Sequence, residues 1–127
     1  MKLERLDHFG LEVGDLTRAE RFYTQVLGLA VVAHLGDHTL LACGDQNLAL
    51  FEVARAALSP DERRDRIAHP LGRGHHAFRV NRADFDTARD RLHAAGVECA
   101  TPIDWGDHDC LYFLDPDGNL LEVVSYR

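Results

Sequence analysis

The sequence predicts an α+β fold in which one β-α-β-β-β unit is used twice. Three observations support this prediction. The segment HFGLEV at 8–13 recurs as HHAFRV at 75–80. A helical stretch follows each copy and ends at a glycine, Gly28 or Gly96. Each copy then closes with an apolar, strand-like run. A repeat of this length indicates one supersecondary unit that packs together with a second copy of itself.

Local sequence patterns predict the strands and the helix of the first unit. Residues 8–13 alternate between polar and apolar side chains, which is the period of a half-buried strand. The motif TRAE at 17–20 has the pattern of a capping box, so a helix is expected from Thr17 to a stop at Gly28. Its apolar stripe consists of Ala19, Phe22, Tyr23, Val26 and Leu27. The three strands expected after it cover 30–35, 38–43 and 47–53.

A polar connector separates this unit from the second one. Ser59 followed by Pro60 is typical of a helix start, so a short helix is expected within the connector. The second unit begins at His75 and repeats the order of the first. Its helix presents Phe85, Ala88, Leu92 and Ala95 on one face, and its last strands are expected near 97–101, 109–114 and 119–126.

The whole chain of 127 residues is expected to form a single domain, because this length suffices for one hydrophobic core. Its parts are module one at about 1–53, a connector at about 54–73 and module two at about 74–127.

The composition excludes several classes of partner. A net charge of −7 with a single lysine argues against nucleic acid, which requires clustered basic residues. No apolar run approaches the length of a membrane span. The three cysteines lack the spacing of a metal or redox motif, which favours reduced thiols and a cytoplasmic location.

Strand alternation separates the histidines that could share a site. Phe9 and its apolar neighbours must face the helix, so His8 lies on the opposite, open face of the sheet. In the second copy His76 shares the parity of the helix-facing Phe78 and is expected to be structural. His75 is therefore expected on the open face.

The last hairpin adds a carboxylate to that face. The sequence Asp115-Pro116-Asp117-Gly118 suits a type I turn followed by a glycine in the left-handed conformation. This register places Tyr112 opposite Glu122, and Glu122 points to the open face between core residues. A carboxylate there requires a charged or metal partner.

Two imidazoles and one carboxylate on a common surface form a facial ligand set that leaves positions for substrate or oxygen. The sequence thus predicts one divalent metal ion on His8, His75 and Glu122. This donor set suits Fe(II), Mn(II), Zn(II), Co(II) or Ni(II).

The chain resembles the vicinal oxygen chelate superfamily, which comprises glyoxalases, bleomycin-resistance proteins and dioxygenases. The resemblance covers nearly the whole chain and is most specific in the segment YFLDPDGNLLE at 112–122. It implies paired βαβββ modules that form a cup-shaped, eight-stranded mixed sheet with helices outside. It also places the family's metal ligands on His8, His75 and Glu122, where the metal would chelate two adjacent oxygens of a small-molecule substrate.

The resemblance implies three candidate enzyme activities. A glyoxalase-like isomerase needs a fourth ligand, but alignment of the two hairpins puts Leu50 there, with Glu52 as a substitute after a register shift. A fosfomycin-type transferase needs cations near its substrate, whereas the segment 102–109 is acidic and Arg79 is the obvious cation on the open face. An extradiol dioxygenase would use Tyr112 to hydrogen-bond a metal-bound oxygen and His108 for acid–base chemistry.

A metal-free, bleomycin-resistance-like protein that sequesters cationic drugs is the alternative. The net charge, Trp105 and the acidic segment near it fit this alternative, but the two histidines and the glutamate do not. The resemblance further implies a homodimer, with the modules paired within one chain or exchanged between two. The favoured prediction is a metal-dependent enzyme that resembles an extradiol dioxygenase.

Overall fold

A computed structural model describes residues 1–127, which divide into two compact units, Met1–Ala57 and Leu58–Arg127. Each unit contains a four-stranded mixed sheet and repeats the βαβββ order. The α+β class and the twofold use of one unit are therefore confirmed. None of the helices combines the length and the apolar character that a bilayer crossing requires.

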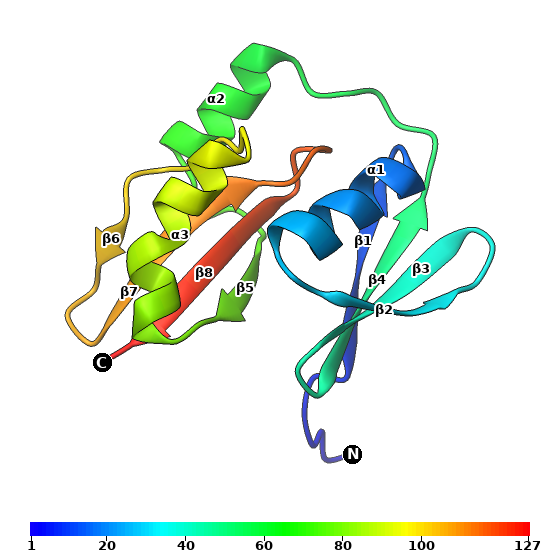
Figure 1. Cartoon of the computed structure of the whole chain (residues 1–127), viewed down its shortest axis with the longest axis horizontal. Coiled ribbons are helices and arrows are strands. Elements are labelled where there is room, and N and C mark those ends of the chain that lie inside the picture. Colours follow the sequence, from blue (N-terminus) through cyan, green and yellow to red (C-terminus); the bar gives the residue numbers. More distant parts are fainter. The chain divides into compact units, whose positions relative to one another are not determined.

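The first unit builds a sheet in the order β1-β4-β3-β2 (Figure 1). Its elements are β1 (His8–Val13), α1 (Leu16–Arg21), the π-helical turn η1 (Phe22–Val26), β2 (Ala30–His34), β3 (His38–Cys43) and β4 (Gln46–Glu52). The strand β1 runs parallel to β4, and the remaining pairs are antiparallel. The expected alternation holds in β1, where Leu11 and Val13 are buried while His8, Gly10 and Glu12 are exposed.

The N-cap of the helix in this unit lies two residues earlier than the sequence suggested. Asp15, rather than Thr17, is the N-cap, because its extended backbone lets the carboxylate accept a hydrogen bond from the Arg18 N–H at 2.8 Å. The predicted apolar stripe packs as expected at Ala19, Phe22 and Tyr23, which are buried.

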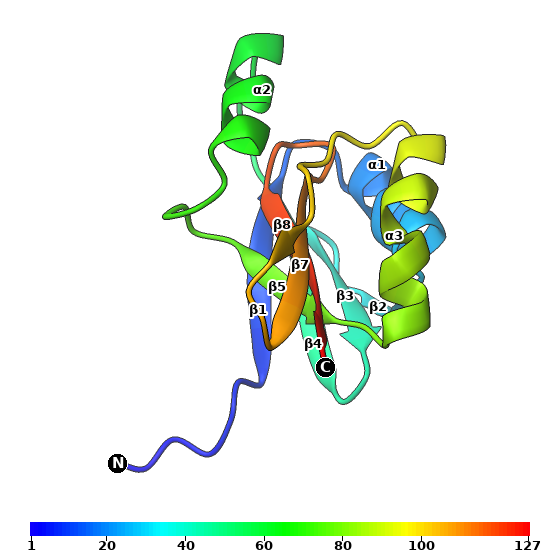
Figure 2. The ribbon, with the colours of Figure 1, turned by 90° about the vertical axis from the view of Figure 1, so that its left-hand side faces the viewer.

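The second unit builds a sheet in the order β5-β8-β7-β6. Its elements are α2 (Pro60–Ala68), β5 (His76–Arg79), α3 (Arg82–Ala94), β6 (Ile103–Asp104), β7 (His108–Leu114) and β8 (Leu120–Tyr126). The helix α3 lies against one face of this sheet and buries Phe85 and Leu92 (Figure 2). The strand expected at 97–101 is shortened to a bridge between Cys99 and Phe113, which the Ala100 N–H extends with a hydrogen bond to the carbonyl of Tyr112 at 2.8 Å. The strand β6 follows Pro102. Proline lacks the N–H that would continue a ladder, which limits this edge of the sheet.

The predicted helix in the connector is α2, and it belongs to the second unit. Ser59 and Glu62 form a complete capping box, with Pro60 at the first helical position. The Arg63 guanidinium donates to the carbonyl oxygens of Asp115 and Pro116, so α2 is fastened to the turn between β7 and β8.

Candidate metal centre

The hairpin formed by β7 and β8 positions two residues of the site. Tyr112 in β7 lies directly opposite Glu122 in β8, as the sequence predicted, and Ala77 in β5 flanks Glu122 on its other side. The carboxylate is nearly buried, since the side chain of Glu122 is only 9% exposed. Its face of the sheet is the one opposite α3, because the neighbours Leu121 and Val123 have the alternate parity.

His75 lies just before β5 and meets the glutamate. Its Nε2 is 2.9 Å from Oε2 of Glu122, and its ring stands edge-on to Tyr112 with centroids 5.2 Å apart. The other ring nitrogen, Nδ1, lies 2.8 Å from the carbonyl oxygen of Arg73. A carbonyl oxygen only accepts hydrogen bonds, so Nδ1 must carry the proton in this contact. In a neutral ring, Nε2 therefore presents a lone pair to a carboxylate oxygen.

That arrangement fits a metal ion. A lone pair and a carboxylate oxygen at 2.9 Å need a proton or a cation to offset their repulsion. Two adjacent ligands, each about 2.1 Å from a divalent ion, stand about 3 Å apart at a right angle, which matches the observed separation. Metal-binding histidines also commonly donate their second N–H to a backbone carbonyl, as His75 does to Arg73.

Tyr112 has a distinct chemical state in this site. Burial is the largest cause and acts together with the neighbouring Glu122 carboxylate and Cys110 thiol to raise the pKa of Tyr112 to about 12. The hydroxyl consequently remains protonated at neutral pH. Tyr112 can donate a hydrogen bond to an oxygen of a ligand, but it cannot act as a base under these conditions.

His76 has the opposite orientation from its neighbour. It is the first residue of β5 and is partly buried, with the parity of Phe78. Burial lowers its pKa, and the adjacent His75 contributes in the same direction. The structure thus supports the prediction that His76 is part of the packed side of the sheet.

His8 is the predicted ligand from the first unit. It is exposed on the open face of β1, and its Nδ1 is 2.8 Å from the Asp7 carboxylate, which leaves Nε2 as the remaining ring nitrogen. The structure contains no group of three or more His, Cys, Asp or Glu side chains placed to hold a metal. It brings together His75 and Glu122, and the addition of His8 to them stays a prediction.

The position that corresponds to Glu122 in the first unit is Ala49, not Leu50. Gly10 pairs with Ala49 in β1 and β4, just as Ala77 pairs with Glu122 in β5 and β8. Counting from the turns gave the wrong residue because the first hairpin has two loop residues between Cys43 and Gln46, one fewer than the second. Alanine cannot bind a metal either.

Glu52 has a structural partner. Its Oε2 accepts a hydrogen bond from the Leu16 N–H at 2.8 Å, at the start of α1. Its strand parity is that of the core residue Leu50. Both observations argue against Glu52 as a fourth metal ligand.

His108 lies farther along the same face as Tyr112. It pairs with Tyr126, and its Nδ1 is 2.6 Å from the Asp107 carboxylate. Four residues of strand separate it from Tyr112, about 13 Å at the usual rise. Its predicted acid–base role therefore requires a ligand that extends along the strand.

Cys110 was not singled out from the sequence, although it shares the parity of Tyr112 in β7. It is fully buried, and the indole N–H of Trp105 donates to its Sγ at 3.2 Å. Burial raises the pKa of this thiol, so it is protonated at neutral pH. The strand alternation that selected Glu122 would also have found it.

Known proteins share both the sequence pattern and the fold. Residues 5–123 match the Glyoxalase/Bleomycin resistance protein/Dioxygenase superfamily. The glutathione transferase FosA from Serratia marcescens is 34% identical over 126 residues, which are 95% of this chain and 80% of that relative. Biphenyl-2,3-diol 1,2-dioxygenase 3 from Rhodococcus globerulus is 30% identical over 94% of this chain, which spans 62% of that enzyme.

The structure of lactoylglutathione lyase from Agrobacterium tumefaciens has a TM-score of 0.74 and 28% identity, and the match covers 98% of this chain and 96% of that one. The matched family residues run from before β1 into β8 and include the part of the last hairpin that carries Tyr112 and Glu122. This chain therefore belongs to the glyoxalase, bleomycin-resistance and dioxygenase superfamily.

Proposed function

We propose that this protein is a divalent-metal-dependent enzyme that acts on a small substrate with two adjacent oxygens. The metal ligands in this proposal are His8, His75 and Glu122. The observation that carries it is the contact between Nε2 of His75 and the nearly buried carboxylate of Glu122, with the second nitrogen of His75 already committed to a carbonyl.

The residues around the ligands have complementary roles. A bound divalent ion supplies a Lewis acid that polarises the oxygens of the substrate. Tyr112, protonated at neutral pH, donates a hydrogen bond to one of those oxygens. The carbonyl of Arg73 keeps the proton of His75 on Nδ1 and so keeps Nε2 available.

The reaction we favour is oxidative ring cleavage of a vicinal diol. The face that holds Tyr112 and Glu122 continues into an aromatic region with Trp105 and His108, which suits an aromatic substrate. The similarity to a biphenyl-diol dioxygenase supports the same class of substrate.

Thiol transfer to an anionic substrate is the second candidate. The similarity to the glutathione transferase FosA supports it. A pocket of about 340 Å³ next to His75 is lined by Arg66, Arg73, Gly74 and Leu120. Arg66 and Arg73 bring positive charge to this pocket in addition to Arg79, although Arg73 already pairs with the Asp65 carboxylate at 2.6 Å.

A metal-free sequestration protein is not favoured. Such a protein would have no reason to bury Glu122 against His75, because burial of a carboxylate is unfavourable without a proton or cation partner.

Metal content tests the proposal directly. Protein purified without chelator should contain about one divalent ion per chain by mass spectrometry. The variant His75→Ala should lose it, because a ligand is removed. The matched variant His76→Ala should retain the metal and lose only thermal stability. Loss of metal from His76→Ala alone would show that the wrong histidine was assigned.

Turnover assays then separate the two reactions. After anaerobic loading with Fe(II), consumption of oxygen with a panel of catechols supports ring cleavage. Consumption of glutathione with a small phosphonate epoxide, after loading with Mn(II), supports thiol transfer instead. A loaded protein that consumes no oxygen across the catechol panel would eliminate the dioxygenase assignment.

A further inference from the structure

Three rings form a row on the face of the second unit that carries Glu122. We call Trp105, His108 and Tyr126 the aromatic row. The planes of Trp105 and His108 differ by 19° with centroids 6.3 Å apart, and those of His108 and Tyr126 differ by 31° with centroids 5.0 Å apart. Arg79 lies over the ring of Tyr126 at 5.2 Å. Trp105 lies at the other end of the aromatic row and is 50% exposed.

The exposed indole is held in place by hydrogen bonds to β7 and by its own loop. Its backbone N–H donates to the carbonyl of His108 at 2.9 Å, and its ring N–H donates to Sγ of Cys110. The next residue, Gly106, donates its N–H to the Asp104 carboxylate at 2.7 Å. An exposed tryptophan with this many local constraints loses little freedom when it binds a ligand.

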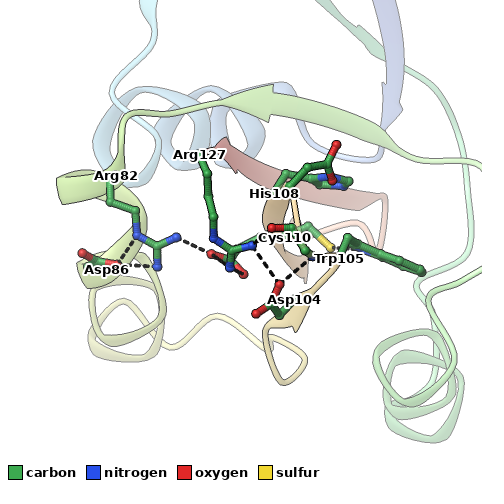
Figure 3. Close-up of polar contacts among 10 residues, drawn as sticks. Arg82, Asp86, Asp104, Trp105, His108, Cys110 and Arg127 are labelled. Atoms are coloured by element: carbon green, nitrogen blue, oxygen red, sulfur yellow. Dashed lines mark hydrogen bonds and ion pairs between the residues drawn. The ribbon is translucent and has the colours of Figure 1, made fainter.

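Ion pairs fasten this loop to the rest of the unit (Figure 3). Arg127 contacts the Asp104 carboxylate at 3.0 Å, the carbonyl of Gly106 and both oxygens of Asp109. Arg82 at the start of α3 binds Asp109 as well. The carboxylate of Asp109, only 10% exposed, thereby joins the C-terminal residue to α3 and fixes the strand that follows Trp105.

The aromatic row lies close to the proposed metal ligands. Cys110, which receives the indole N–H, is two residues from Tyr112 on β7, a distance of about 7 Å along the strand. Tyr112 is directly opposite Glu122. One aromatic substituent on a diol would span this separation, whereas a plain catechol would not reach the indole.

We propose that Trp105 stacks against a second aromatic ring of the substrate, so that the protein selects aryl-substituted compounds with adjacent oxygens. This inference rests on the proposed function for the position of the oxygens. Trp105 is the exposed end of the aromatic row. Aromatic rings pack on such a surface with centroids 4.5–7 Å apart. The indole plane is nearly parallel to the ring of His108, which in turn packs against Tyr126.

The single tryptophan of the chain provides a direct readout. Titration with 3-phenylcatechol, excited at 295 nm, should change the emission of Trp105, and 3-cyclohexylcatechol, which has a saturated ring of similar size, should change it much less. By calorimetry the phenyl compound should bind about fivefold more tightly than the cyclohexyl compound, the preference expected of an aromatic pair.

Two variants isolate the ring itself. Trp105→Phe should retain most of the preference for phenyl over cyclohexyl, whereas Trp105→Leu should abolish it, and both should keep their metal content. Equal affinities for the two compounds in the unmodified protein, or an unchanged preference in Trp105→Leu, would overturn the inference.

The same titration, read together with the metal content, separates this inference from the proposed function. If the purified protein holds no metal and takes none up, an emission change that 3-phenylcatechol still causes would refute the metal site and leave the stacking role of Trp105 intact. If the protein holds its metal and binds catechol, but 3-phenylcatechol leaves the emission of Trp105 unchanged, the stacking role alone would be refuted.

Discussion

At the scale of single residues, Gly118 sets the position of Glu122. It has φ +81° and closes the turn between β7 and β8, where its N–H donates to the carbonyl of Asp115 at 3.0 Å. A Cβ atom at this position would lie 2.2 Å from Cδ1 of Leu58. Glycine is therefore required here both for its backbone conformation and for the close approach of Leu58.

The substitution Gly118→Ala should lower the free energy of unfolding more than Gly72→Ala does. Both glycines have φ +81°, but nothing lies within 4 Å of a Cβ at Gly72. The backbone strain, about 1 kcal/mol, is common to the two variants. The clash with Leu58 should add about 1–3 kcal/mol in Gly118→Ala only. Urea unfolding measures both values.

The added change Leu58→Ala is the control, since it should recover part of the excess loss in Gly118→Ala. Equal losses in the two glycine variants would mean that Leu58 moves aside without penalty.

Residue orientation near the site was predictable because strand alternation is a local rule. It assigned His75 and His76 to opposite faces and placed Tyr112 opposite Glu122, and the structure confirms both placements. The alignment of the two hairpins gave Leu50 in place of Ala49, because the two loops differ in length and offset the count by one residue.

At the scale of elements, α2 is more than a tether between the units. Arg63 pairs with Glu98 at 2.6 Å and with the turn that precedes β8, while Arg66 donates to the carbonyl of Gly118 at 2.7 Å. Ile67 packs against the apolar cluster beside Tyr112. The helix thus supports the hairpin that carries Tyr112 and Glu122.

The pair of Arg63 and Glu98 should make stability depend on pH. The hydrogen bond from Arg63 lowers the pKa of Glu98, so the pair stabilises the fold above the ordinary glutamate pKa of about 4.3. This contribution disappears as the pH falls through the lowered pKa. Glu98→Gln should therefore lose about 1 kcal/mol at pH 7, a value reduced for the partial exposure of Glu98.

The difference between Glu98→Gln and the unmodified protein should shrink as acid unfolding curves are recorded at pH values below about 4. Asp61→Asn is the matched control, because Asp61 and Arg64 form an exposed pair on the same helix and should contribute nothing measurable. A pH-independent difference for Glu98→Gln would contradict the assignment.

At the scale of the whole molecule, the proposed metal site needs residues from both units. Each unit is compact by itself, and His8 belongs to one while His75 and Glu122 belong to the other. Family enzymes commonly form dimers, and two modules can pair within a chain or be exchanged between chains.

We expect a homodimer by light scattering, with twice the 14.2 kDa mass of the chain. Mixing the variants His8→Ala and His75→Ala distinguishes the two arrangements. In an exchanged dimer, one site of each mixed pair keeps all its ligands and regains metal. With pairing within a chain, neither site is complete and the mixture remains metal-free. A monomer that binds metal would exclude the exchanged arrangement.

The twofold βαβββ architecture, the faces of the strands and the pairing of Tyr112 with Glu122 could all be predicted from the residue pattern. These features depend on side-chain period and turn chemistry, which act over a few residues. Three contacts could not be predicted in this way: the carbonyl of Arg73 with His75, the indole of Trp105 with Cys110, and Arg127 with the loop of Trp105. Those contacts join residues through the fold of the backbone, and no local pattern specifies which distant groups it brings within hydrogen-bond distance.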